Sequence, residues 1–158
     1  MRWTDIRVRS ADEHGRWVRR RDGLQGSGGT QHGIVDERRV GLNGRMILHI
    51  CPSAAWHDVT DGQYRCRSLE TEGFIHCSTP EQVIEVANYL FRGQRGLVLL
   101  VIDSERVRAR ILDEDAGNGK LYPHIYGPLN IDAVVRTAPF EPRQDGTFTL
   151  PSGFIPSA

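Results

Sequence analysis

The stretch Leu97-Val98-Leu99-Leu100-Val101-Ile102 decides the fold, because it is a run of large apolar residues without a polar interruption. A strand with one solvated face alternates apolar and polar residues, whereas a strand covered on both faces is apolar throughout. The run has the usual length of a strand and is short for a buried helix. We therefore predict a central strand over residues 97–102, with other structure packed against each face.

Residues on both sides of this run predict further elements of a β-rich sheet. The remaining strand patterns are short and separated by turn residues: 46–51, 73–78, 107–112 and 131–138. A turn at Asp145-Gly146 predicts a hairpin that brings 147–150 beside the preceding strand, and a short helix is expected from Pro52-Ser53 through Trp56. We expect an α+β fold with one mixed, β-rich sheet, one main helix and several short helices.

The main helix is predicted to begin at Ser78 or Thr79, since either side chain can cap its first turn. Pro80 suits the first turn of a helix, and Glu81 complements the helix dipole. Apolar residues then recur at helical spacing before Gly93, which we expect to end the helix: Val83, Ile84, Ala87, Leu90 and Phe91.

Residues 1–45 differ from the rest of the 158-residue chain, with ten arginines against six acidic residues, a net charge of +4. Neither a helical nor a strand period persists in them, so ordering them would bury too little apolar surface to offset the lost entropy. We predict a disordered or loosely ordered basic extension, and expect nucleic acid as a partner only through this arm. Residues 46–158 are predicted to form a single α+β domain that folds without the extension.

Composition narrows the functional class. The domain carries a net charge of −4, which argues against a binder of duplex nucleic acid that neutralises phosphates. Apolar runs fall short of the roughly 18–20 residues that cross a bilayer, and the N-terminal arginines precede no apolar stretch typical of a secretory signal. The three cysteines are odd in number and lack metal-binding spacing. We expect a cytoplasmic protein with reduced thiols.

Two histidines interrupt apolar strand patterns. His49 lies in the strand over 46–51 on the same face as Ile47 and Cys51, and His76 shares a face with Phe74 and Ser78. An unpaired polar group at such a position costs about 1–3 kcal/mol, so each histidine needs a partner. One such histidine is usually a satisfied core residue, but two on separate strands favour a shared cleft. Backbone N–H groups where the strand ends and the helix begins at Ser78 would suit an anionic ligand.

The stretch Tyr122-Pro123-His124-Ile125-Tyr126-Gly127-Pro128 has a backbone restricted by two prolines and a glycine. One interpretation is a rigid turn whose aromatic side chains fill the core. The other is a loop that presents His124 and Tyr126 to a planar ligand, since binding groups concentrate on loops held by a rigid scaffold. We predict no metal site, because the histidines lie on separate elements without HxH or HExxH spacing. His76 and Cys77 point to opposite faces of a strand, so they do not form a nucleophile pair.

Several stretches combine into a recognisable pattern: Ile47-Leu48-His49, Trp56, Gly73-Phe74-Ile75-His76-Cys77-Ser78, Asn88, the strand ending at Asp103, and Pro123-His124-Ile125-Tyr126-Gly127. This pattern resembles the small bacterial family called domain of unknown function 952 (DUF952) over residues 46–155. Such proteins are similar in fold to the ADP-ribosyltransferases, and more closely to RNA 2′-phosphotransferases in strand order and histidine placement. The resemblance therefore implies an ADP-ribosyltransferase-like fold, although a fold does not establish a function.

The resemblance also implies roles for individual residues. His49 would bind the ribose or the nicotinamide side of NAD, and His76 and Ser78 would line the same cleft. Many ADP-ribosyltransferases place a glutamate on a late strand, whereas this chain has His124 and Tyr126 there. Glu114, in the polar stretch 113–115, is the nearest carboxylate. The arginines that hold the 2′-phosphate in an RNA phosphotransferase are not evident.

We therefore expect a domain that binds NAD or a related nucleotide, with transfer or hydrolysis of its ADP-ribose as the first hypothesis. The catalytic residues would be His76, Glu114 and His124, and the cofactor-binding residues His49, Ser78 and Tyr126. A second hypothesis is a catalytically silent module for a nucleotide or another small anionic metabolite. A third and less favoured one is a metal-dependent enzyme, which would need a metal site that the histidine spacing does not indicate.

Overall fold

The computed structural model describes residues 10–11, 17–18 and 44–154. Two short strands, β1 (Ser10–Ala11) and β2 (Trp17–Val18), pair antiparallel near the N-terminus. The predicted disorder of residues 1–45 otherwise falls almost entirely on residues outside those described. Arg45 is described, and its guanidinium makes a bidentate ion pair with Asp113 at 2.8 and 2.9 Å.

The predicted central strand is confirmed. β6 (Leu97–Asp103) lies between β3 (Met46–Pro52) and β10 (Val134–Phe140), and both neighbours run antiparallel to it. The unbroken apolar run is explained by burial on both faces. Alternate residues of β6 enter two different hydrophobic cores, one containing Val98, Leu100 and Ile102 and the other containing Leu97, Leu99 and Val101.

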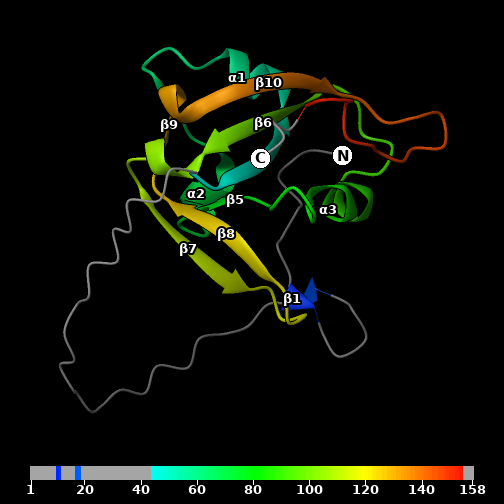
Figure 1. Ribbon diagram of the computed structural model, residues 1–158, viewed down its shortest axis with the longest axis horizontal. Coiled ribbons are helices and arrows are strands. Elements are labelled where there is room, and N and C mark those ends of the chain that lie inside the picture. Colours follow the sequence, from blue (N-terminus) through cyan, green and yellow to red (C-terminus); the bar gives the residue numbers. More distant parts are fainter. Residues whose placement is uncertain (1–9, 12–16, 19–43, 155–158) are drawn as a thin grey trace.

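A second antiparallel sheet consists of β5 (Ile75–His76), β8 (Leu121–Tyr126) and β7 (Arg110–Asp115), with β8 in the centre. In Figure 1 it lies below the β10–β6–β3 sheet. The two sheets meet where Leu48 of β3 and Ser78 exchange backbone hydrogen bonds of 2.8 Å. Every strand pairing in the described part of the chain is antiparallel, so the expectation of one mixed sheet is wrong.

The stretch 122–128 was predicted as a turn or loop, but most of it belongs to the central strand β8. Pro123 is tolerated there because proline lacks only the backbone N–H, so at most one hydrogen bond of the ladder is missing. Its carbonyl accepts the N–H of Cys77 at 2.9 Å, and in an antiparallel ladder its nitrogen points the same way, toward the end of the short strand β5. The missing donor therefore costs one bond at a strand end.

Other strand boundaries also differ from the prediction. Of the strand predicted over 73–78 only residues 75–76 form β5, and β10 begins at 134 rather than 131 because residues 131–133 form a 3-10 helix. β7 begins at Arg110 rather than 107, since the N–H of Arg108 donates to the side chain of Asn130 instead of a ladder partner. Residues 147–150 follow a turn but do not form a strand. The side chain of Asp145 accepts the N–H of Thr147, and the N–H of Phe148 donates to Asn88, so these backbone groups are not available to a hairpin.

The main helix α3 (Val83–Leu90) packs Val83 and Ala87 into the core, as predicted, but it begins later than expected. Residues 79–82 form a turn in which the carbonyl of Thr79 accepts the N–H of Gln82, so Gln82 is the N-cap, and it makes no side-chain capping hydrogen bond. The predicted caps are therefore wrong. The predicted short helix after Pro52 is confirmed.

The remaining elements are short and connect the two sheets: α1 (Ser53–His57), β4 (Gln63–Tyr64), α2 (Arg67–Thr71), η2 (Ser104–Arg106), β9 (Leu129–Asn130) and η3 (Ile131–Ala133). β4 and β9 form a two-stranded antiparallel sheet. Among the described residues, no helix has the length and apolar character needed to cross a membrane.

Candidate functional site

Two histidines predicted from separate motifs lie side by side. His76 of β5 and His124 of β8 are register partners, so their side chains share one face of the sheet. Their imidazole rings meet edge to face, with centroids 5.0 Å apart. This face points away from the core that receives the intervening residues Ile75 and Ile125. The sheet register thus creates the histidine pair.

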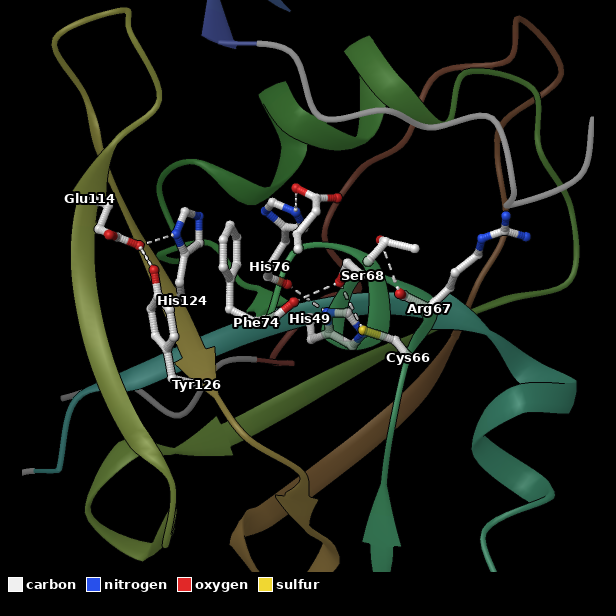
Figure 2. Close-up of polar contacts among 11 residues, drawn as sticks. His49, Cys66, Arg67, Ser68, Phe74, His76, Glu114, His124 and Tyr126 are labelled. Carbon is white, nitrogen blue, oxygen red and sulfur yellow. Dashed lines mark hydrogen bonds and ion pairs between the residues drawn. The ribbon is translucent and has the colours of Figure 1, made fainter. Parts of the chain in front are cut away.

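Each imidazole has its own carboxylate. Glu114 of β7 accepts a hydrogen bond from Nδ1 of His124 at 2.7 Å and another from the hydroxyl of Tyr126 at 2.7 Å. Nε2 of His76 lies 3.2 Å from a carboxylate oxygen of Glu72. Figure 2 shows Glu114, Tyr126, His124, Phe74 and His76 in one continuous group.

Phe74 joins the two halves. Its ring stacks on His124 with centroids 4.2 Å apart and packs edge to face with His76, with centroids 4.7 Å apart. Tyr126 lies 5.2 Å from the same ring and is 37% exposed, so the group reaches solvent. We call this group the histidine-pair surface, formed by Glu72, Phe74, His76, Glu114, His124 and Tyr126.

The protonation states within this surface follow from burial and hydrogen bonding. Burial is the largest influence on His124 and lowers its pKa, and the hydrogen bond to Glu114 opposes this only in part. Burial raises the pKa of Glu114, but donation from Tyr126 and His124 outweighs it, so the net shift is downward. Burial and the bond to Glu114 raise the pKa of Tyr126 to about 12.

At neutral pH, Glu114 is therefore a carboxylate, Tyr126 a phenol and His124 a neutral imidazole. A carboxylate only accepts, so the proton of His124 resides on Nδ1. Its Nε2 then has a free electron pair and can accept a proton. A carboxylate that orients an imidazole in this way is the arrangement that supports general acid–base catalysis.

His49 does not reach this surface. Its side chain is buried, with 3% of the residue exposed, and both ring nitrogens have partners inside the protein. Nδ1 lies 2.6 Å from the carbonyl of His76, and Nε2 lies 3.1 Å from the hydroxyl of Tyr64. Burial lowers the pKa of His49 to about 4, so the ring is neutral at pH 7. The structure thus places His49 beneath the histidine-pair surface.

Ser78, the other predicted binding residue in that motif, is also buried, and its backbone joins β5 to β3. The structure therefore brings four predicted site residues together on one face: His76, Glu114, His124 and Tyr126. Phe74 was predicted on the face of His76, and it lies there. The sequence interpretation missed Glu72, for which the only signal is its spacing of four residues from His76.

Among the described residues, the other candidates for a site are a metal centre, a cysteine nucleophile and a pocket. No group of three or more histidine, cysteine, aspartate or glutamate side chains there is arranged to hold a metal ion. The three cysteines are buried free thiols, and Cys77 enters the core while His76 faces outward. A pocket of about 240 Å³ between α1, β6 and β10 includes Trp56 and His57 but no residue of the histidine-pair surface. The histidine-pair surface is therefore distinct from this pocket.

Comparison with protein families gives a match to the model described as "Protein of unknown function (DUF952)" over residues 50–137. The chain belongs to this family. The matched segment contains every residue of the histidine-pair surface, whereas His49 lies one position before it. The family predicted from the sequence motifs is thereby confirmed.

Solved structures of protein CC0527 from Caulobacter crescentus resemble this DUF952 chain. Its X-ray structure matches at 33% identity and a TM-score of 0.61, covering 66% of this chain and 93% of that one. A double mutant of the same protein matches equally well. The solution NMR structure matches at 32% identity and a TM-score of 0.54, covering 65% and 90%. A search of curated proteins found no match.

Proposed function

We propose that the histidine-pair surface binds NAD or a related nucleotide and that His124 and Glu114 act there as an acid–base pair for transfer or hydrolysis of ADP-ribose. The observation that supports this most directly is that His124 and Tyr126 both donate a hydrogen bond to the same carboxylate oxygen of Glu114. These hydrogen bonds hold the imidazole in a single tautomer with Nε2 unprotonated. The sequence resemblance to ADP-ribosyltransferases supports NAD as the first ligand to test.

The chemistry suits the charges on this surface. When the bond between nicotinamide and ribose breaks, nicotinamide leaves with the bonding electrons and positive charge develops on the sugar. The carboxylates of Glu72 and Glu114 would stabilise that charge. Water or an acceptor hydroxyl would form the new bond to the sugar carbon, and its proton would pass to Nε2 of His124.

A positive charge that could bind the diphosphate of NAD lies at the edge of the sheet. Arg110 is the register partner of Tyr126, so both side chains lie on the face of the histidine pair. The guanidinium is close enough to lower the pKa of Glu114. It would hold a phosphate beside Tyr126 while the nicotinamide end lies nearer the imidazoles.

A catalytically silent binding module is the second candidate. It is favoured by the contacts that the two carboxylates already make, since Glu72 pairs with His76 and Glu114 with His124 and Tyr126. A carboxylate with these donors is stabilised before any ligand arrives. Such a surface would recognise a ligand without accelerating its cleavage.

The test is thermal unfolding of the full chain with and without NAD, followed by an assay for free nicotinamide. Because a ligand bound only by the native state stabilises it, NAD at 100 times its Kd would add about 2.7 kcal/mol. We expect His124→Ala and Glu114→Gln to abolish nicotinamide release, while Glu105→Gln, an exposed carboxylate on η2, leaves it unchanged. Stabilisation without release supports the silent module. No stabilisation at any NAD concentration refutes NAD as the ligand and, with it, the proposed ADP-ribose chemistry.

A further inference from the structure

The strand that carries His76 has little support of its own. β5 contains only Ile75 and His76, and its ladder partner β8 lies on one side of it. A two-residue strand makes few backbone hydrogen bonds, so other contacts have to hold the carbonyls in the strand and directly before it. The structure provides two buried side chains for this purpose, one from β3 and one from α2.

These side chains bind the carbonyls of Phe74 and His76. Nδ1 of His49 lies 2.6 Å from the oxygen of His76, and the hydroxyl of Ser68 donates to the oxygen of Phe74 at 2.8 Å. Figure 2 shows His49 and Ser68 close together, with dashed bonds to the carbonyl oxygens of the segment that carries the rings of Phe74 and His76. His49 and Ser68 are 3% and 8% exposed, so water does not replace them readily.

We infer that His49 is a positioning residue that, with Ser68, fixes the backbone of residues 74–76 and thereby holds Phe74 and His76 against His124. Its value for catalysis or binding rests on the proposed function of that surface. The geometric part of the inference stands independently, because the contact between the rings exists without a ligand.

The tautomer of His49 follows from its partners. A carbonyl oxygen only accepts, so Nδ1–H of His49 donates to His76. Nε2 is then unprotonated and accepts the hydroxyl hydrogen of Tyr64 at 3.1 Å. The rings of His49 and Tyr64 are also in contact, with centroids 5.4 Å apart. The imidazole is therefore held from both ends, and only one end touches the site strand.

This asymmetry allows a matched pair of variants. In His49→Asn, the side-chain amide occupies the place of Nδ1–H and can still donate to the carbonyl of His76. In His49→Gln, the amide reaches the place of Nε2 and can meet Tyr64 but not that carbonyl. Both replace an imidazole by a carboxamide, so a general loss of stability would affect them alike.

The experiment is NMR of the full chain in the absence of ligand, measuring nuclear Overhauser contacts from the Phe74 ring to His124 and between His76 and His124. We expect His49→Asn to retain these contacts and His49→Gln to lose at least half of their intensity, while amide shifts of β6 stay unchanged. Ser68→Ala, which removes the other carbonyl donor, should weaken the Phe74 contact. It serves as the test if His49→Gln does not fold.

Equal contact intensities in wild type, His49→Gln and Ser68→Ala would overturn the inference. Equal losses in His49→Asn and His49→Gln would also overturn it, because they would show a structural role that does not depend on the carbonyl bond. The proposed function is judged separately, by NAD-dependent stabilisation and nicotinamide release in the wild type. Either result can therefore fail without the other.

Discussion

Acidification should destabilise this protein through His49 before its carboxylates titrate. Burial lowers the pKa of His49 from 6.5 to about 4, so the folded state resists protonation that the unfolded chain accepts. The stabilising contribution is complete above pH 6.5 and is lost as the pH falls toward about 4. The difference corresponds to about 3 kcal/mol, a large part of the stability of an ordinary domain.

His124 and Glu114 also contribute to the dependence of folding stability on pH. The pKa of His124 is also lowered, chiefly by burial, so His124 adds a loss of the same sign below pH 6.5. Glu114 acts in a lower window, because its pKa is depressed in the folded state. Its contribution is present above its ordinary value of 4.5 and is lost only as the pH falls through the folded value.

The assay is urea unfolding of the full chain at a series of pH values between about 7 and about 4.5. Around pH 5, one proton taken up on unfolding gives a slope of about 1.4 kcal/mol per pH unit. His49→Asn removes the titrating ring, so its slope should be smaller by nearly that amount whatever its stability at pH 7. An unchanged slope would refute the argument. So would an NMR titration in which the His49 ring becomes protonated near pH 6.5.

Two further predictions concern the chain ends and the thiols. A protein starting at Met46 should still unfold in one cooperative transition, and a broad, non-cooperative melt would contradict this. It should be about 1–2 kcal/mol less stable, because it loses the half-exposed Arg45–Asp113 ion pair and the backbone hydrogen bond from Ser104 to the carbonyl of Arg45. Burial raises the pKa of Cys51 to about 12 and that of Cys77 also upward, so a thiol reagent should label neither until urea unfolds the protein. Rapid labelling of either cysteine in the native state would be inconsistent with the structure.

The first sheet was predictable because its signal is local. An apolar run such as 97–102 requires burial on both faces whatever its neighbours are, and the two cores on either side of β6 provide it. β8 gives the opposite local signal, since Pro123 and Gly127 are typical of turns. It is a central strand because β5 and β7 supply hydrogen bonds from residues far away in the sequence.

The candidate site divides in the same way. The sequence identified His76, Glu114, His124 and Tyr126 as separate polar residues on strand-like or loop-like segments. Their meeting depends on the register between β5, β8 and β7, and a shift of one residue would place each side chain on the opposite face. Single-chain patterns contain no information on register between distant segments, so only the family resemblance grouped His76 with His124, and the edge-to-face contact of their rings was decided by the tertiary structure.

From the sequence alone came the family, the central strand, the main helix and the histidines and glutamate around which the site is built. These depend on side-chain type and short-range spacing, which the chain specifies directly. Tertiary structure alone decided that His49 turns inward to the carbonyl of His76 while His124 turns outward to Glu114. The reason is physical: a buried imidazole takes the orientation in which it finds hydrogen-bond partners, and those partners come from other elements of the fold.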